Sequence, residues 1–167
     1  MKMRRASIVA SVIAGLVVLL AACTNPFAPT STSSDAIALA PEVKSAVDQF
    51  VAKYNAHDAV GAGELLLEDP GFHWVEDGRI VYDTRTAAIT GLTNFLAGFN
   101  ASHIETYEMK VAMLTEDAAF ATSRYTQTIA ANGQAALRSE GTISLAIANR
   151  DGWKIVGVHK SASSPLR

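Results

Sequence analysis

The chain has 167 residues, with 14 Lys and Arg against 16 Asp and Glu, 49% hydrophobic residues and one cysteine, Cys23. This length suits a single domain that buries a substantial core, and one cysteine excludes a disulfide within the chain. The slight acidic excess argues against a nucleic-acid partner, because such binding depends on clustered cations.

The first 22 residues combine a basic start with an apolar run. Lys2, Arg4 and Arg5 precede apolar residues 8–20, and the run ends in Leu-Ala-Ala before Cys23. A bilayer-spanning helix needs about 20 residues, so the run is short for a permanent anchor. The segment resembles a bacterial lipoprotein signal peptide, which implies removal of residues 1–22 and lipidation of Cys23. An ordinary secretory leader is the alternative, but it leaves the cysteine unexplained.

Removal of the leader leaves 11 Lys and Arg against 16 Asp and Glu, a net charge of about −5 in residues 23–167. Such a chain is poorly suited to holding anionic lipid by charge, so membrane attachment is expected through the acyl chains on Cys23. Thr24, rather than Asp, follows the cysteine. The resemblance therefore implies an exported protein on the outer membrane, or on the outer face of the plasma membrane in a single-membrane host.

Thr, Ser, Ala and Pro dominate the residues after Cys23 and predict a lipidated flexible tether over residues 23–40. We expect the folded domain over residues 41–163 and a short tail over residues 164–167. Its first helix is expected from Pro41 to Tyr54, where apolar residues recur at three-and-four spacing.

Two further helices are predicted in the N-terminal half. The first is short and covers residues 60–67, before the chain-breaking Asp69-Pro70-Gly71. The other follows Thr84 or Thr86, either of which can cap its first turn.

Residues 72–82 contain the strongest local pattern of the domain. Asp77-Gly78 lies between two β-prone runs and predicts a hairpin with a two-residue turn of positive φ. This register places His73 opposite Tyr82 on one face of the hairpin, and leaves open which face lines the interior. The expected pairs are Glu76 with Arg79, Val75 with Ile80, Trp74 with Val81 and His73 with Tyr82.

Alternation with a period of two predicts four more strands. In the first, Tyr107 shares a face with Met109; in the last, Trp153 and His159 share a face and Lys160 lies opposite. The predicted strands cover residues 103–115, 118–130, 137–148 and 153–161.

The order helix, helix, hairpin, helix and long antiparallel meander, with Asp-Gly-Trp-Lys-Ile-Val at 151–156 and His-x-Ser at 159–161, resembles the nuclear transport factor 2-like superfamily. The SnoaL-like and ketosteroid isomerase-like branch is nearest, and the resemblance covers about residues 42–163. It implies an α+β fold: a cystatin-like cone of three helices on a strongly curved, mixed or antiparallel sheet of about six strands, with a pocket at the open end. Members of the superfamily include isomerases, cyclases, dehydratases, binding domains and dimerisation modules, so the fold does not select a function.

Aromatic and titratable side chains are the candidates for that pocket. In a catalytic hypothesis His73, Tyr82 and His159 are the proton-transfer groups; the alternative is that they fill the sheet face or bind neighbouring strands. The predicted lining comprises Tyr54, His73, Tyr82, Tyr107, Tyr125, Trp153 and His159.

Acid-base enzymes of this shape need a carboxylate or histidine in an apolar environment. Glu76 is expected beside the hairpin turn, paired with Arg79, and the other acids that can be placed fall in turns or on polar faces. The four histidines, at 57, 73, 103 and 159, have no metal-ligand spacing, and no phosphate loop is present, so we predict no metal and no cofactor.

Together these patterns predict an exported, noncatalytic domain that binds a small apolar ligand or forms a homodimer through its sheet. The alternative is an isomerase-, cyclase- or dehydratase-like enzyme acting on a small apolar substrate.

Overall fold

The computed structural model of the protein describes the backbone of residues 34–165 and the side chains of residues 38–163. The predicted leader and Cys23 lie outside the described residues. The described helices are α1 (Ser34–Asn55), α2 (Ala59–Glu64) and α3 (Arg85–Ala97), and the strands are β1 (His73–Glu76), β2 (Arg79–Tyr82), β3 (Ala101–Met113), β4 (Ala118–Ala130), β5 (Leu137–Asn149) and β6 (Trp153–Pro165).

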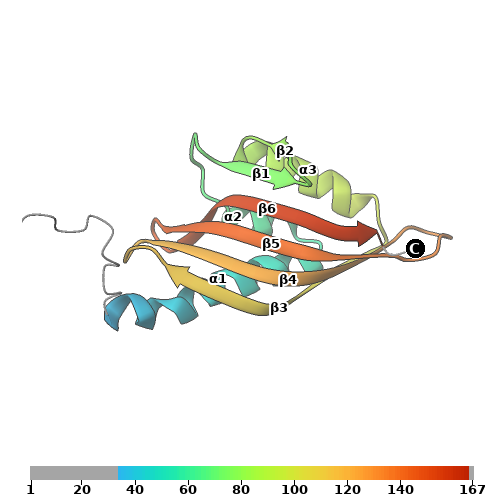
Figure 1. Ribbon diagram of the computed structural model, residues 1–167. Helices are drawn as coiled ribbons and strands as arrows, with labels where there is room; N and C mark the ends of the chain where they lie inside the picture. The colour runs from blue at the N-terminus through green and yellow to red at the C-terminus, as the bar shows by residue number, and fades with distance from the viewer. Residues whose placement is uncertain (1–33, 166–167) are drawn as a thin grey trace, which may run out of the picture. The chain divides into compact units, whose positions relative to one another are not determined.

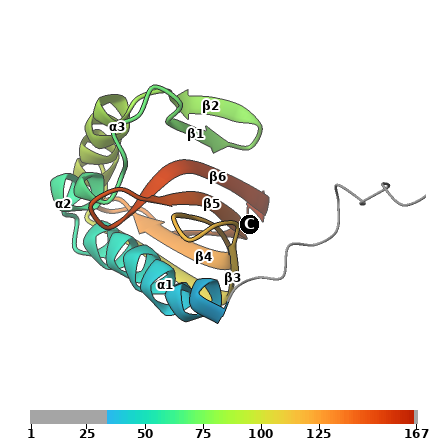
Figure 2. The same ribbon diagram turned by 90° about the vertical axis from the view of Figure 1, so that its left-hand side faces the viewer.

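All six strands form one mixed sheet in the order β2-β1-β6-β5-β4-β3. Among the strand pairs that the structure describes, β1–β6 alone is parallel, and the other neighbours are antiparallel. The sheet curves around α1, and the described helices lie on one face and leave the other uncovered (Figures 1 and 2). This arrangement confirms the predicted α+β cone.

Helix α1 begins at Ser34, which corrects the prediction of a tether up to residue 40 and a helix from Pro41. Residues 36–40 read Ala-Ile-Ala-Leu-Ala and have high helix propensity, which outweighs the hydrogen bond that Pro41 cannot donate inside the helix. The predicted apolar stripe is buried: Val43 and Val47 are 0% and 2% exposed.

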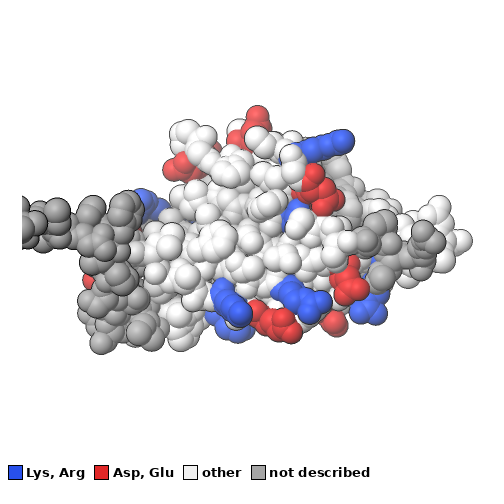
Figure 3. Space-filling model, viewed as in Figure 1, with Lys and Arg blue, Asp and Glu red and all other residues white. Residues whose placement is uncertain are grey.

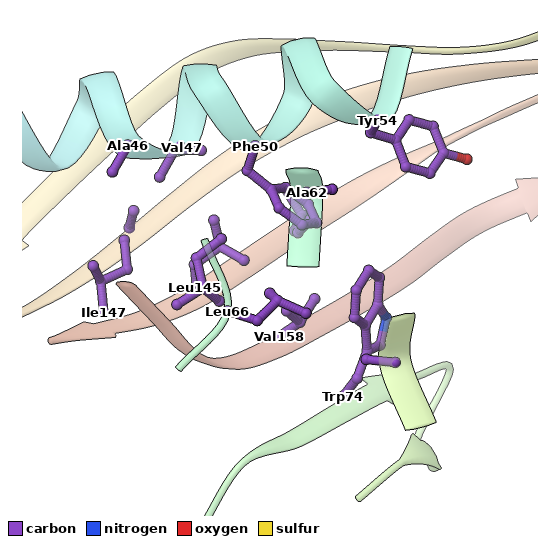
Figure 4. Packing of buried hydrophobic residues seen from close by; sticks show 14 of the residues in the cluster. Ala46, Val47, Phe50, Tyr54, Ala62, Leu66, Trp74, Leu145, Ile147 and Val158 are labelled. Atoms are coloured by element: carbon purple, nitrogen blue, oxygen red, sulfur yellow. The ribbon is translucent and has the colours of Figure 1, made fainter. Parts of the chain in front are cut away.

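One end of the cone is filled by side chains and is called here the closed end, defined by Ala46, Val47, Leu145, Ile147 and Trp153. Figure 4 shows Ala46 and Val47 of α1 facing Leu145 and Ile147 of β5. The Trp153 indole N–H donates a hydrogen bond to Glu42 Oε2 over 3.3 Å, which ties β6 to the start of the buried stripe of α1. This end holds the helix on the sheet.

The β1–β2 hairpin has the predicted turn, with φ of 47° at Asp77 and 79° at Gly78. The two pairs next to the turn are as predicted, but Tyr82 pairs with Trp74 rather than with His73. Val81 is therefore an extra residue without a partner on β1. Bulges are common in edge strands such as β2, and this one lets the Tyr82 ring pack edge-on against Trp74. The predicted His73–Tyr82 pair is therefore wrong.

Strand β6 contains a second bulge, which reverses the predicted faces at its C-terminal half. Ile155 pairs with Ile147 but Gly157 pairs with Ala146, so Val156 has no partner on β5. A shift of one residue moves every later side chain to the opposite face. As a result Lys160 points into the cone and His159 is exposed on the other face.

A third bulge lies in β3, where Glu108 adopts a positive φ of 56°. Tyr107 pairs with Arg124 and Lys110 with Thr122, so two residues of β3 stand opposite Ser123. The Ser123 hydroxyl donates a hydrogen bond to the Tyr107 carbonyl over 2.8 Å, so this backbone oxygen at the bulge has a hydrogen-bond partner. Tyr107 consequently does not share the face of the later apolar residues, contrary to the sequence prediction.

Other local predictions agree with the structure. Strand β4 coincides with the predicted residues 118–130, and Thr84 caps α3, its hydroxyl accepting a hydrogen bond from Ala87 N over 3.1 Å.

Candidate ligand-binding site

The wide end of the cone contains a cavity of about 150 Å³, called here the cone pocket. It lies between the C-terminal half of α1, helix α3, the β1–β2 hairpin and the inner face of the sheet. Its aliphatic wall comes from five elements and consists of Val51, Leu92, Ile104, Ile129 and Ile143. The remaining lining is aromatic or polar.

Five aromatic side chains line the cone pocket: Phe50, Tyr54, Trp74, Tyr82 and Phe95. The Phe50 and Trp74 ring centres lie 6.1 Å apart, and those of Trp74 and Tyr82 lie 5.8 Å apart in an edge-to-face arrangement. Figure 4 shows Trp74 reaching from β1 toward the side of α1 that carries Phe50 and Tyr54. Such rings supply an apolar, rigid surface for a ligand.

The position of the Tyr82 ring depends on a glycine in α3. A Cβ atom at Gly91 would overlap the Tyr82 ring and its hydroxyl. The absence of a side chain at this helix position lets the ring lie against the helix backbone, which holds Tyr82 in the pocket wall.

A chain of hydrogen bonds crosses the cone pocket. Lys160 Nζ donates to Gln127 Oε1 over 2.7 Å, and Gln127 Nε2 donates to the Tyr54 hydroxyl over 2.6 Å. The Tyr54 hydroxyl is also hydrogen-bonded to Ser102 Oγ at 2.9 Å. Among the described side chains, no fully buried nitrogen or oxygen lacks a partner. The network links β6, β4, α1 and β3 and so orders the polar part of the lining.

The carboxylate of Glu76 and the ammonium of Lys160 form the charged part of the lining. Glu76 Oε1 accepts a hydrogen bond from the Trp74 indole N–H over 3.1 Å and lies 3.8 Å from Lys160 Nζ. The Glu76 side chain is 39% exposed and that of Lys160 is 18% exposed. Below them the Tyr125 ring is buried, with its centre 5.3 Å from Lys160 Nζ. The pocket thus places a charged pair at the edge of an apolar cavity.

Burial raises the pKa of three tyrosines around this site. For Tyr54 the cause is desolvation, which the hydrogen bonds from Ser102 and Gln127 partly oppose. Desolvation also raises the pKa of Tyr82, with the charge of Glu76 adding to it. The pKa of Tyr125 rises to about 12, mainly through desolvation and then through the nearby carboxylates. All three phenols are therefore neutral at physiological pH.

Asn55 fixes the end of α1 that carries the pocket residues. Its side chain donates to the Ile104 carbonyl over 2.9 Å and accepts from the Ile104 N–H over 2.8 Å. This two-way bond anchors the helix to β3 next to Tyr54 and Ser102.

Two of the sequence-predicted lining residues, Tyr54 and Tyr82, lie in the cone pocket. His73 and His159 are exposed, and His73 Nδ1 lies 2.9 Å from the carbonyl of Gly71. The structure therefore does not bring together the three side chains of the catalytic hypothesis.

The other three predicted residues also lie away from the pocket lining. Tyr107 packs against Arg124, whose guanidinium carbon lies 5.2 Å from the ring centre. Tyr125 is buried beneath Lys160, and Trp153 belongs to the closed end.

Sequence reasoning missed Glu76, Gln127 and Lys160 as pocket residues. The sequence predicts Glu76 beside the turn and paired with Arg79, as observed, but its position two residues after Trp74 also places it on the face of the buried indole. The alternation of residues in β6 predicts that Lys160 faces away from the cone. The bulge at Val156, which the sequence does not indicate, reverses this orientation.

Within residues 34–165, no three His, Cys, Asp or Glu side chains are arranged to hold a metal ion. In the same part of the chain, the helices are too short or too polar to cross a membrane.

The fold and its pocket define the protein as an α+β cone of the nuclear transport factor 2-like type. A family model described as the SnoaL-like domain matches residues 43–165. The chain belongs to the SnoaL-like domain family.

Solved structures support the same fold. A nuclear transport factor 2-like superfamily protein from Salmonella enterica serovar Typhimurium LT2 is 17% identical, with a TM-score of 0.66 over 78% of this chain and 94% of that one. Hexachlorocyclohexane dehydrochlorinase LinA-type3 from Novosphingobium barchaimii LL02 is 12% identical, with a TM-score of 0.66 over 79% and 92%.

A protein from Novosphingobium aromaticivorans DSM 12444, assigned provisionally as a scytalone dehydratase, is 11% identical, with a TM-score of 0.72 over 79% of this chain and 89% of that one. No curated protein sequence matches the chain. At these identities the similarity establishes the fold alone.

Proposed function

We propose that this domain binds a small, largely apolar ligand in the cone pocket and does not transform it. The observation that carries the proposal is the cavity itself: about 150 Å³ lined by aliphatic and aromatic side chains at the wide end of a cone whose other end is filled. The buried polar side chains of the lining bind one another in a continuous network. Such a network orients a ligand and rigidifies the wall.

The size of the cavity restricts the ligand. An apolar protein cavity of about 150 Å³ accommodates a molecule of the size of benzene. A single six-membered ring therefore fits the cone pocket, whereas a fused ring system requires the wall to open.

Calorimetric titration of the full chain with benzene tests this proposal. We expect saturable binding that is lost in Val51→Phe, because the larger side chain occupies the pocket. Val60→Phe is the matched control, since Val60 is 64% exposed on α2 and does not line the pocket. Absence of binding to the wild type, or equal binding by both variants, would contradict the proposal.

A second candidate function is self-association through the uncovered face of the sheet. Figure 3 views this face and shows few charged side chains across its middle. Phe120, Ala146 and His159 are exposed there on β4, β5 and β6. Two copies meeting face to face on a two-fold axis would bring no like charges together at this centre. A second copy of the same chain therefore suits the surface.

Sedimentation equilibrium tests the self-association. We expect a dimer that Phe120→Glu converts to a monomer, because the substitution places two like charges in the interface. Leu114→Glu is the control, since Leu114 is 67% exposed in the β3–β4 turn. A wild-type monomer at high micromolar concentration would reject this candidate.

An enzymatic alternative rests on a different observation: the carboxylate of Glu76 and the phenol of Tyr82 line the same cavity. A carboxylate beside an apolar substrate can accept a proton, and a phenol can donate one. Chloride release from hexachlorocyclohexane, the compound named for one structural relative, is a first assay. Activity that disappears in Glu76→Gln while benzene still binds would support the enzyme; no chloride release would reject this reaction.

We further propose that the protein is an exported lipoprotein anchored through Cys23. The support is the sequence of residues 1–23: a basic start, a short apolar run and small residues before the cysteine. Labelling of growing cells with palmitate, followed by membrane fractionation, tests this. We expect a labelled membrane protein, and an unlabelled, unanchored precursor for Cys23→Ser. Equal membrane recovery of both forms would contradict lipid anchoring.

A further inference from the structure

The cone pocket presents a hydrogen-bond donor and an acceptor side by side at the edge of its apolar cavity. A protonated lysine carries three N–H donors. Within the described residues, Lys160 Nζ makes one hydrogen bond, to Gln127 at 2.7 Å, and lies 3.8 Å from Glu76, beyond hydrogen-bond distance. Two ammonium donors therefore remain for a ligand.

The carboxylate of Glu76 supplies the acceptor. Both of its recorded contacts fall on Oε1: the hydrogen bond from the Trp74 indole and the approach of Lys160. No N–H or O–H of residues 38–163, whose side chains the structure describes, donates to its other oxygen, Oε2. Both side chains line the cavity and are partly exposed, Glu76 by 39% and Lys160 by 18%, so a ligand in the cavity can reach both groups.

From this juxtaposition we propose that the cone pocket selects an uncharged single-ring compound that carries a hydroxyl group, such as a phenol. The inference rests on the proposed ligand-binding function and specifies the ligand class. The ring occupies the cavity between Phe50, Trp74 and Phe95. Its hydroxyl oxygen accepts a hydrogen bond from Lys160 Nζ, and its O–H donates to Glu76 Oε2.

The same pair discriminates against other ring compounds. Benzene can make neither hydrogen bond, so the free donors of Lys160 and the free oxygen of Glu76 stay bound to water when benzene binds. Benzoate can accept from Lys160, but its negative charge would lie beside the carboxylate of Glu76, and like charges at such distances repel. A hydroxyl is both donor and acceptor and has no charge, so it matches the pair.

Calorimetric titrations of the full chain with phenol, benzene and benzoate test the proposal. A hydrogen bond to a charged group increases affinity by about tenfold or more, so phenol is expected to bind about tenfold more tightly than benzene, and benzoate more weakly than phenol. Lys160→Met keeps an unbranched side chain, one atom shorter, but removes the ammonium donors, and should reduce phenol affinity to about that of benzene. Lys154→Met is the matched control on the same strand, because Lys154 Nζ donates to the Glu64 carbonyl outside the pocket.

The outcomes separate the two proposals. Benzene and phenol binding equally well, benzoate binding most tightly, or an unchanged phenol preference in Lys160→Met would overturn the hydroxyl selectivity while leaving an apolar binding site. No binding of any of the three compounds would overturn both the selectivity and the proposed function.

Discussion

The two ends of the cone are built from the same helix and the same sheet, but they differ in what their side chains contact. At the closed end, Val47, Leu145 and Ile147 are each 2% exposed and belong to one buried apolar cluster. At the wide, open end, residues of the last turns of α1 and of the sheet line the cone pocket, a cavity of about 150 Å³. The comparison indicates that the two halves of α1 have different roles. The first half stabilises the fold, and the second half supplies residues of the cone pocket.

Truncation at the closed end should have the largest effect on stability. Leu145→Ala removes a fully buried side chain and leaves a cavity, which we expect to lower the free energy of unfolding by about 2–5 kcal/mol. Urea denaturation followed by circular dichroism measures this. Because Leu145 does not line the cone pocket, the affinity of the folded protein for benzene should stay unchanged. A loss below 1 kcal/mol would mean that this end is not closely packed.

Alkaline pH should destabilise the protein through the tyrosines near the open end. The raised pKa of Tyr125, about 12 against 10.0, means that its neutral form stabilises the fold below pH 10. Above pH 10 the unfolded chain releases this proton more readily, so stability falls as pH rises toward 12, by on the order of 2 kcal/mol.

Denaturation of wild type and Tyr125→Phe at pH 8, 10 and 11 isolates this contribution. The variant should lose less stability over that interval, because phenylalanine has no proton to release. Parallel pH profiles for the two proteins would contradict the role of Tyr125.

Breaking the polar network should cost about 1–3 kcal/mol. Tyr54→Phe removes the hydroxyl shared by Ser102 and Gln127, which leaves two buried polar groups without their partner. Asn55→Ala is a poor control, because it removes the two hydrogen bonds that join α1 to Ile104 of β3. Gln49→Ala is a better control, because the Gln49 side chain is exposed on the same helix. Equal stability of Tyr54→Phe and Gln49→Ala would show that the network does not stabilise the open end.

The smallest effect on stability is expected at Gly91. A methyl group there overlaps the Tyr82 ring, but this ring is only half-buried and can swing outward. We expect Gly91→Ala to change stability by less than about 1 kcal/mol while lowering benzene affinity, because one wall of the cone pocket moves. Gly98→Ala is the control, since a methyl group at that position meets only ordinary contacts. Unaltered affinity in both variants would exclude Tyr82 as a pocket wall.

Sequence reasoning succeeded where the signal is local. The three-and-four spacing through Val43 and Val47, the Asp77-Gly78 turn and the Thr84 cap each depend on neighbouring residues, and each is present in the structure. The bounds of β4 followed from alternation in the same way.

It failed where the orientation of a side chain depends on distant packing. Bulges at Val81, Glu108 and Val156 shift the strands by one residue, and each shift moves later side chains to the opposite face. The bulge at Val156 excludes His159 from the pocket and brings Lys160 into it, and the bulge at Val81 separates Tyr82 from His73. Nothing in the alternating pattern marks them, because they are selected by the curvature of the whole sheet.

The open cavity is tested most directly by the two indole N–H signals of the protein in a nitrogen–proton correlation spectrum. Trp74 lines the cone pocket and Trp153 lies at the closed end, so one signal reports binding and the other is an internal control. Titration with benzene should shift the Trp74 signal saturably and leave that of Trp153 in place. No shift of either signal, or equal shifts of both, would contradict a ligand site at the wide end of the cone.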